Sequence, residues 1–440
     1  MATLFFSLLA LTGQIGEAEK TDAVPSSRVF RGVFNSPGGE LPFLFELADG
    51  EERLDGWLIN GSERVKIPIV YRLKDTIMFA IEQYAAEVDM KGTDWVSLGK
   101  QQVPLLMRGE WRKRIAPQKR IKLEFEANEY QGYLFQPLAK PPSTKPSYPP
   151  ITGRWSVQFS LSSEPAIGLF HQSADGKVEG TFLTSTGDYR YLAGSYEYGR
   201  LRLSVFDGAH AFLFDATMQA DGTLEGDFWS RLSWHETWTA KRDESAQLRD
   251  GFTYVKWKEG VGFGSVRFPD ADGNIRKMDH PKFKGKARII EVFGTWCPNC
   301  HDAAEILQEL HERYHEKGLR TLALAFENSG KFQNDSRQVK RFMKRHHITF
   351  PIMVANEPEK KNVLAALPML ENTHAYPTTV FMREDGSIRA IHSGFSGPAT
   401  GPEYEKLKWK FESIVREMLG MPPLGAPGIK TDLRTPVNAP

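Results

Sequence analysis

The chain has 440 residues, a formal net charge of +1 and a charged fraction of 25%, which are ordinary values for a globular protein. This length predicts about three domains. The nearly balanced charge gives no sign of a nucleic-acid-binding surface. No apolar run reaches the length of about 18 residues that a membrane-spanning helix needs, so no membrane span is expected.

The first 20 residues predict an export signal. The apolar run from Leu4 to Leu11 has the length of a signal-peptide core, and Gly16-Glu17-Ala18 fits a small-x-small cleavage site. A positively charged segment before the run is missing, apart from the α-amino group. Either the signal is weak or the true start lies upstream; we expect residues 1–20 to be a weak signal peptide, and the protein to lie in the periplasm or another extracytoplasmic compartment.

Two all-β domains are predicted next, at residues 21–137 and 151–243, with a proline-rich linker at 138–150. Their short alternating strands are separated by Gly, Asp-Gly and Asn-Gly turns, without a convincing helix pattern. Each domain is expected to be a small barrel or sandwich of roughly eight strands.

The two β segments align with each other as copies of one unit. The aligned pairs are residues 54–58 with 178–182, 107–111 with 224–228, and 125–127 with 238–240.

The second copy contains the string Asp207-Gly208-Ala209-His210, which lies between two predicted strands. Asp-Gly is a hairpin turn signal, so a structural turn is the favoured interpretation. The many aromatic residues of this copy are interpreted as core packing, with an apolar ligand inside a barrel as the alternative.

The only two cysteines of the chain lie three positions apart in Trp296-Cys297-Pro298-Asn299-Cys300. A buried strand is predicted over 289–294 and a helix over 302–317. Cys297 is thus placed at a helix N-terminus, where unpaired N–H groups and the helix dipole stabilise a thiolate. Cys300 follows one turn later and is close enough to attack a mixed disulfide at Cys297.

Other interpretations of this pair are weaker. A zinc site needs about four nitrogen or sulfur ligands, and no second CxxC or CxxH completes one, so no metal is expected. A structural disulfide across two residues closes too small a loop to add much stability. His301 is expected to be solvated, and so are His346 and His347 at the end of a basic helix.

Residues 252–420, somewhat under half of the chain, resemble the thioredoxin-like redoxins of the TlpA/ResA type, the exported thiol–disulfide oxidoreductases of bacteria. Four segments carry the resemblance in the expected order: Glu291 to Cys300, Tyr376-Pro377-Thr378-Thr379-Val380-Phe381, Asp385-Gly386-Ser387-Ile388, and His392-Ser393-Gly394-Phe395-Ser396-Gly397 before a last helix.

The resemblance implies a thioredoxin-like α/β domain at residues 250–421 and a cis-proline loop at Pro377 that packs against the CxxC. The residues expected to bind the substrate are Trp296, Pro298, Tyr376 and Pro377. The proline-rich tail, residues 422–440, is expected to be disordered.

Glu291 is the third candidate catalytic residue, beside Cys297 and Cys300. It lies in an apolar strand six residues before Cys297, so desolvation should raise its pKa towards neutrality and suit it to accept the proton of Cys300. The alternative, a strand-edge glutamate that faces water, ranks second because central parallel strands are covered on both faces. Thioredoxins themselves carry a buried Asp at this position, whereas many TlpA/ResA relatives carry Asn. The ResA-type glutamate three residues after the second Cys is replaced here by Ala303.

The predicted function is a thiol–disulfide oxidoreductase without cofactor that reduces disulfides of exported proteins. An unidentified upstream thiol donor would re-reduce it, and the β domains would serve as scaffold or docking surface. The alternative is a lipocalin-like β binding protein with an accessory, redox-sensing redoxin domain. A peroxidase is disfavoured, because peroxiredoxins place Thr or Ser three residues before the reactive Cys, where this chain has Gly294.

Overall fold

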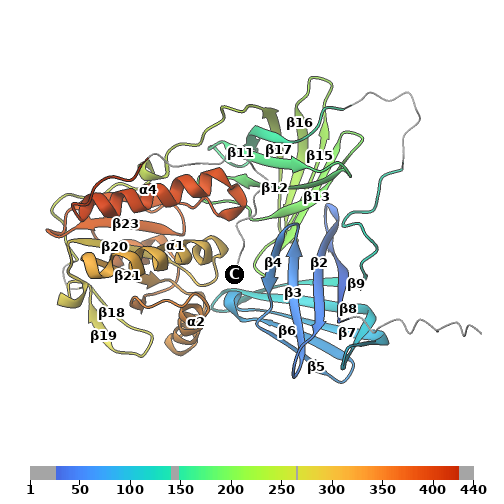
Figure 1. The fold of residues 1–440 in the computed structure, drawn as a ribbon, viewed down its shortest axis with the longest axis horizontal. Helices are drawn as coiled ribbons and strands as arrows, with labels where there is room; N and C mark the ends of the chain where they lie inside the picture. The colour runs from blue at the N-terminus through green and yellow to red at the C-terminus, as the bar shows by residue number, and fades with distance from the viewer. Residues whose placement is uncertain (1–25, 140–147, 264–265, 426–440) are drawn as a thin grey trace, which may run out of the picture.

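The computed structural model describes residues 26–139, 148–263 and 266–425. The predicted signal peptide, most of the linker and most of the tail lie outside these ranges. No helix within them is long and apolar enough to cross a membrane. Figure 1 shows three units, with the α/β unit on the left and the two β units on the right.

The first β unit is one antiparallel sheet of nine strands in the order β4-β3-β2-β1-β9-β8-β7-β6-β5. Its alternating residues bury one face around Phe34, Phe45 and Trp111. The strands are β1 (Ser27–Ser36), β2 (Gly39–Asp49), β3 (Leu54–Asn60), β4 (Glu63–Lys66), β5 (Ile69–Leu73), β6 (Thr76–Ile81), β7 (Ala86–Leu98), β8 (Gln101–Ala116) and β9 (Lys119–Glu129).

The second β unit is a closed barrel of eight antiparallel strands. Aromatic rings pack inside it, with the centroids of Phe214 and Phe228 4.4 Å apart and those of Phe182 and Phe214 4.6 Å apart. The strands are β10 (Gly153–Phe159), β11 (Ala166–Gln172), β12 (Lys177–Leu183), β13 (Leu192–Glu197), β14 (Arg200–Phe206), β15 (Ala211–Met218), β16 (Leu224–Ser230) and β17 (Trp234–Arg242).

The three aligned segment pairs of the two copies fall on equivalent strands. They lie on β3 and β12, on β8 and β16, and on β9 and β17. The copies differ in strand number and in closure: the eight-stranded barrel is closed and its β12 pairs with β13, whereas the nine-stranded first sheet has β4 and β5 at its two ends. The prediction of tandem all-β domains is confirmed, with one unit closed and the other open.

The two β units share a core. Phe206, Ala211 and Leu213 from the β14–β15 hairpin of the barrel belong to the apolar cluster of the first sheet. The indole Nε1 of Trp111 donates a hydrogen bond to the Gly208 carbonyl at 3.2 Å, and the Ser204 hydroxyl donates to the Pro42 carbonyl at 2.7 Å. The hairpin tip at 207–210 is therefore held by the first β unit.

The C-terminal unit is a five-stranded sheet in the order β22-β21-β20-β23-β24 with helices on both faces, which confirms the predicted thioredoxin-like domain. A small hairpin, β18 (Arg267–Pro269) and β19 (Ile275–Lys277), precedes it. Its other elements are β20 (Ala287–Phe293), α1 (Pro298–Tyr314), β21 (Leu319–Ala325), α2 (Phe332–Arg345), β22 (Ile352–Val354), α3 (Lys360–Ala366), β23 (Thr378–Arg383), β24 (Ile388–Ser393) and α4 (Pro402–Met418).

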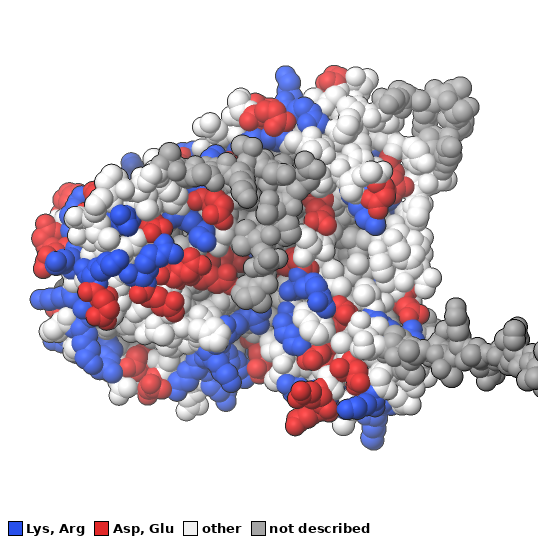
Figure 2. Space-filling view, viewed as in Figure 1, with Lys and Arg blue, Asp and Glu red and all other residues white. Residues whose placement is uncertain are grey.

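The central strand β20 is buried along its whole length, because the sheet is covered on both faces. Ile289 and Phe293 pack with residues of α1, α2 and α4, whereas Ile290 and Val292 pack with α3 and the segment before the sheet. Strand alternation places Glu291 on the same face as Ile289 and Phe293, under α1. On the visible surface, acidic and basic side chains are intermingled over this domain (Figure 2).

Candidate active site

The two thiols lie at the start of α1, at the carboxyl end of β20. Cys297 is the N-cap residue and Pro298 occupies the first turn, where its missing N–H costs nothing. The Cys300 amide donates to the Cys297 carbonyl at 3.1 Å. Cys297 retains 7% of its surface and Cys300 2%, so Cys297 is the less buried of the two thiols.

The loop before β23 faces Cys297. The Tyr376–Pro377 peptide bond is cis, and the Tyr376 carbonyl oxygen lies 3.7 Å from Cys297 Sγ. Trp296 donates from Nε1 to the Phe326 carbonyl at 2.8 Å and meets the Tyr376 ring edge-on at a centroid distance of 5.4 Å. Trp296 and Tyr376 line a cavity with Cys297, whereas Pro298 and Pro377 are buried and do not line it.

Glu291 is buried within strand β20. Its side chain is 3% exposed, and neither carboxyl oxygen has a hydrogen-bond partner among the residues described. Burial raises its pKa to about 8. Burial, then the neighbouring Cys297 and Glu291, raise the pKa of the Cys300 thiol well above its ordinary value. The charge of Glu291 therefore acts on this thiol.

Glu327 is a second buried carboxyl that the sequence analysis missed. Its two carboxyl oxygens accept hydrogen bonds from the Thr295 amide at 2.8 Å and the Thr295 hydroxyl at 2.7 Å, and burial raises its pKa to about 8. Its position two residues after β21 was an available signal, since carboxyl ends of neighbouring parallel strands meet at one sheet edge. Glu327 orients the backbone directly before the CxxC.

The expectation that His301 and His346 are solvated was wrong. Both side chains are buried, with His301 Nδ1 2.7 Å from His346 Nε2 and His301 Nε2 2.8 Å from the Thr295 carbonyl. Burial lowers the pKa of His346 to about 3. The Tyr84 ring of the first β unit packs edge-on against His301 at 5.1 Å, so packing from another unit covers this helix end.

The barrel reaches the redox site through the turn after β12, residues 184–189, which we call the barrel turn. The Ser185 carbonyl lies 3.0 Å from His374 Nε2. The Asp188 carboxylate accepts hydrogen bonds from the Asn299 side-chain amide at 3.2 Å and from the Gly397 amide at 2.5 Å. The barrel turn therefore contacts the loops that surround Cys297.

A buried ion cluster joins all three units next to the barrel turn. Arg190 pairs with Glu63 of the first β unit at 2.6 Å and with Asp302 of α1. All three side chains are at most 11% exposed. Burial raises the pKa of Glu63, although Arg190 acts against this shift.

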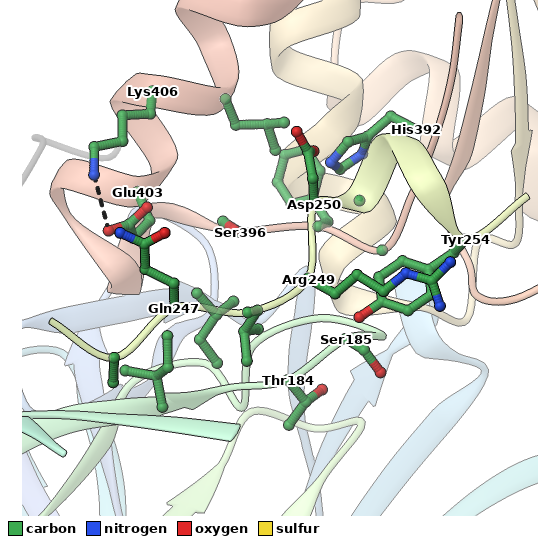
Figure 3. Close-up of a pocket in the computed structure, with 18 of the residues that line it drawn as sticks. Thr184, Ser185, Gln247, Arg249, Asp250, Tyr254, His392, Ser396, Glu403 and Lys406 are labelled. Carbon is green, nitrogen blue, oxygen red and sulfur yellow. Dashed lines mark hydrogen bonds and ion pairs between the residues drawn. The ribbon is translucent and has the colours of Figure 1, made fainter. Parts of the chain in front are cut away.

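Two cavities lie on either side of the barrel turn. The cavity at Cys297 has a volume of about 240 Å³ and is lined by the barrel turn, His210 and Phe212 on one side and by Trp296, Cys297 and Tyr376 on the other. The second, of about 410 Å³, lies between the barrel, the connecting segment 244–254 and α4. Figure 3 shows Thr184 and Ser185 at its lower wall, opposite the Glu403–Lys406 pair. Neither cysteine lines this second cavity.

Similarity to known proteins falls on the domain that carries this site. The Redoxin family matches residues 258–407. Thioredoxin-like protein YneN of Bacillus subtilis is 31% identical over 147 residues, covering 32% of this chain and 78% of that protein. Thiol-disulfide oxidoreductase ResA of Bacillus thuringiensis is 26% identical over 141 residues, covering 32% of this chain and 74% of that protein. A crystal structure of a putative thiol:disulfide interchange protein DsbE from Chlorobium tepidum covers 38% of this chain and 100% of its own, with 17% identity and a TM-score of 0.29.

Proposed function

Because the chain belongs to the redoxin family of thioredoxin-fold, ResA-like thiol–disulfide oxidoreductases, we propose that it reduces disulfides of exported proteins through Cys297 and Cys300. The observation that carries this proposal is the different placement of the two thiols. Cys297 opens onto a cavity at the N-terminus of α1, and Cys300 is closed off behind it.

The exchange proceeds in two steps. The Cys297 thiolate attacks one sulfur of the substrate disulfide, forming a mixed disulfide and releasing the first substrate thiol. Cys300 then loses its proton to Glu291 and attacks Cys297 Sγ. The second substrate thiol leaves, and the protein retains a Cys297–Cys300 disulfide that an upstream thiol donor must reduce.

Glu291 suits the second step because of its surroundings. A carboxyl with a pKa of about 8 is a stronger base than an ordinary glutamate and still ionises near neutral pH. The Cys300 thiol has a raised pKa and needs such a base. Trp296 and Tyr376 would flank the bound disulfide, since they share the cavity with Cys297.

Export is proposed from the apolar run Leu4–Leu11 and the cleavage-type string Gly16-Glu17-Ala18. The lipocalin-like alternative gains no support, because aromatic side chains occupy the barrel interior: Phe159, Phe170, Phe182, Phe214, Phe228 and Trp238.

Two cysteine variants test the exchange. Cys297→Ser should abolish reduction of a protein disulfide, and Cys300→Ser should accumulate mixed disulfides visible on non-reducing gels. Cys297 should also be alkylated faster than Cys300 at mildly acidic pH. Faster labelling of Cys300, or activity that survives in Cys297→Ser, would refute the proposal. The reduction potential of the pair then separates a reductant from an oxidant.

A further inference from the structure

The barrel contributes an ionisable side chain to the cavity in which Cys297 lies. His210, at the tip of the β14–β15 hairpin, lines this cavity together with Cys297, Trp296 and Tyr376. Its side chain is 26% exposed, so it is open to a molecule that enters. No residue of the thioredoxin-like domain supplies a comparable imidazole to this cavity wall, as far as the chain is described.

A buried carboxylate fixes the orientation of His210. Asp207 is 1% exposed. One of its oxygens accepts hydrogen bonds from the amides of Ala209 at 2.8 Å and His210 at 2.6 Å, and the other lies 3.1 Å from His210 Nδ1. Burial acts to raise the pKa of Asp207, but His210, Arg190 and the backbone donor hold it below its usual range. Asp207 is therefore an anion that keeps the proton of His210 on Nδ1.

Hydrogen bonds from the first β unit hold the hairpin tip in place. Trp111 and Lys113 of β8 donate hydrogen bonds, at 3.2 Å each, to the carbonyls of Gly208 and Ala209. On its other side, the His210 ring stacks on Phe212 with a centroid distance of 4.7 Å. With the ring fixed and Nδ1 bound to Asp207, Nε2 is left without a hydrogen-bond partner within residues 26–139, 148–263 and 266–425.

We propose that His210 is a proton-exchanging group of the reaction pocket, acting on the sulfur atoms at Cys297 from the barrel side. This proposal rests on the function proposed above. Its geometric basis is a histidine held by a buried aspartate in the wall of the cavity that contains the attacking thiol.

The first step conserves protons. Nε2 takes the proton of the Cys297 thiol, which leaves a thiolate and an imidazolium. The thiolate attacks the substrate disulfide, so one S–S bond breaks and the mixed S–S bond forms. The imidazolium returns its proton to the leaving substrate sulfur, and His210 is neutral again.

Other ionisable groups also act on this pocket. Burial raises the pKa of Asp188 in the barrel turn, and a proton on His210 acts against this shift. Burial lowers the pKa of Lys113 to about 8, against the effects of Asp207 and Cys297. The ionisable residues that line this cavity or act on the residues around His210 are Lys113, Asp188, Tyr189, Arg190, Asp207, Arg231, Cys297 and Tyr376.

The test uses the full chain carrying Cys300→Ser, so that Cys297 is the single thiol, and measures its alkylation by iodoacetamide across pH. His210→Gln should slow alkylation at pH 7 by about tenfold and move the midpoint up by about one pH unit, since one unit is a tenfold change in thiolate. In the chain with both cysteines, His210→Ala should lose turnover that added imidazole restores.

His235 of the barrel provides a matched control for His210. His235 pairs with Asp227 at 2.7 Å and stacks on Trp229 at 5.1 Å, but it does not line the cavity at Cys297. His235→Gln should leave both readouts unchanged.

A His210→Gln profile that overlays the parent, or an equal loss in His235→Gln, would overturn the role of His210. These outcomes differ from failure of the proposed function, which would show as disulfide reduction independent of Cys297.

Discussion

The thioredoxin-like domain and the junction of the three units at Arg190 hold buried carboxyl groups in different ways. Inside the thioredoxin-like domain, Glu291 and Glu327 are buried, and burial raises the pKa of each to about 8. At the junction, Arg190 of the barrel is buried between Glu63 of the first β unit and Asp302 of α1. Glu291 and Glu327 can gain and lose protons near neutral pH, whereas the carboxyl groups at the junction pair with a cation.

The two arrangements suit different roles: the first suits proton transfer, and the second holds the units together. A buried carboxyl without a cation destabilises the fold but can serve as a base. A buried ion pair has little use as a base, but it fixes how the units meet, and removing one partner is costly. We expect removal of the Arg190 cation to destabilise the protein, and removal of the Glu291 carboxyl to stabilise it while slowing the second step.

The largest effect is expected for Arg190→Met. Removing the guanidinium leaves two buried carboxylates without their cation, so the free energy of unfolding should fall by about 3–5 kcal/mol. The loss should shrink as the pH falls below 7, because burial raises the pKa of Glu63 above its ordinary value and a protonated carboxyl no longer needs the cation. Chemical denaturation at pH 7 and at lower pH measures both effects.

Arg200→Met is the matched control for Arg190→Met. Arg200 pairs with Asp215 on the barrel surface, where its side chain is 46% exposed, so the loss should stay below about 1 kcal/mol. Equal losses in the two variants would mean that the buried cluster does not hold the units together.

Glu291→Gln should have the next largest effect. Between about pH 4.5 and 8 the folded wild type keeps a proton on Glu291 that the unfolded chain releases, so wild-type stability falls as pH rises, by at most about 1.4 kcal/mol per unit. The Glu291→Gln variant lacks this pH-dependent loss of stability. Its gain in stability over wild type should be absent near pH 4 and grow up to pH 8. Calorimetry at several pH values tests this.

The same change should slow resolution of the mixed disulfide more than its formation, because Cys300 acts only in the second step. Stopped-flow kinetics separate the two steps. Glu327→Gln is the control: it removes an equally buried carboxyl that is bound to Thr295. If Glu327→Gln slowed resolution as much, Glu291 would not be the proton acceptor.

The smallest effect concerns the contact between the barrel turn and the loop after β24. Gly394 has φ of +86°, and a Cβ there would lie 2.5 Å from the Ser185 carbonyl oxygen. Gly394→Ala should cost about 1–2 kcal/mol from the left-handed backbone alone and also displace the barrel turn. Faster amide hydrogen exchange over residues 184–189 would report that displacement.

Gly386→Ala isolates the backbone cost. Gly386 has φ of +89°, but an added Cβ would meet only the Arg288 side chain at 3.7 Å. If both alanine variants left exchange in the barrel turn unchanged, that turn would not be packed against the redox site.

The local sequence pattern was sufficient to predict the strand and the helix that carry the two cysteines. The apolar run before Cys297 and the apolar spacing after Cys300 predicted a buried strand and a helix, and β20 and α1 lie there. Glu291 could be picked out because an ionisable residue inside an apolar strand is conspicuous. The first copy of the β unit was less predictable, since closure depends on whether β4 and β5 meet, and no local signal encodes that pairing.

The sequence by itself thus determined the strand and helix that flank the two cysteines, the order of the three units and the duplication, because each leaves a local signature: a spacing, a periodicity or a repeat. The tertiary structure alone decided that His301 and His346 are buried, that Glu327 meets Thr295, and that the barrel turn and His210 share a cavity with Cys297. These contacts join residues that are 32 or more positions apart, and their energies depend on burial and distance, which arise only when the units pack together.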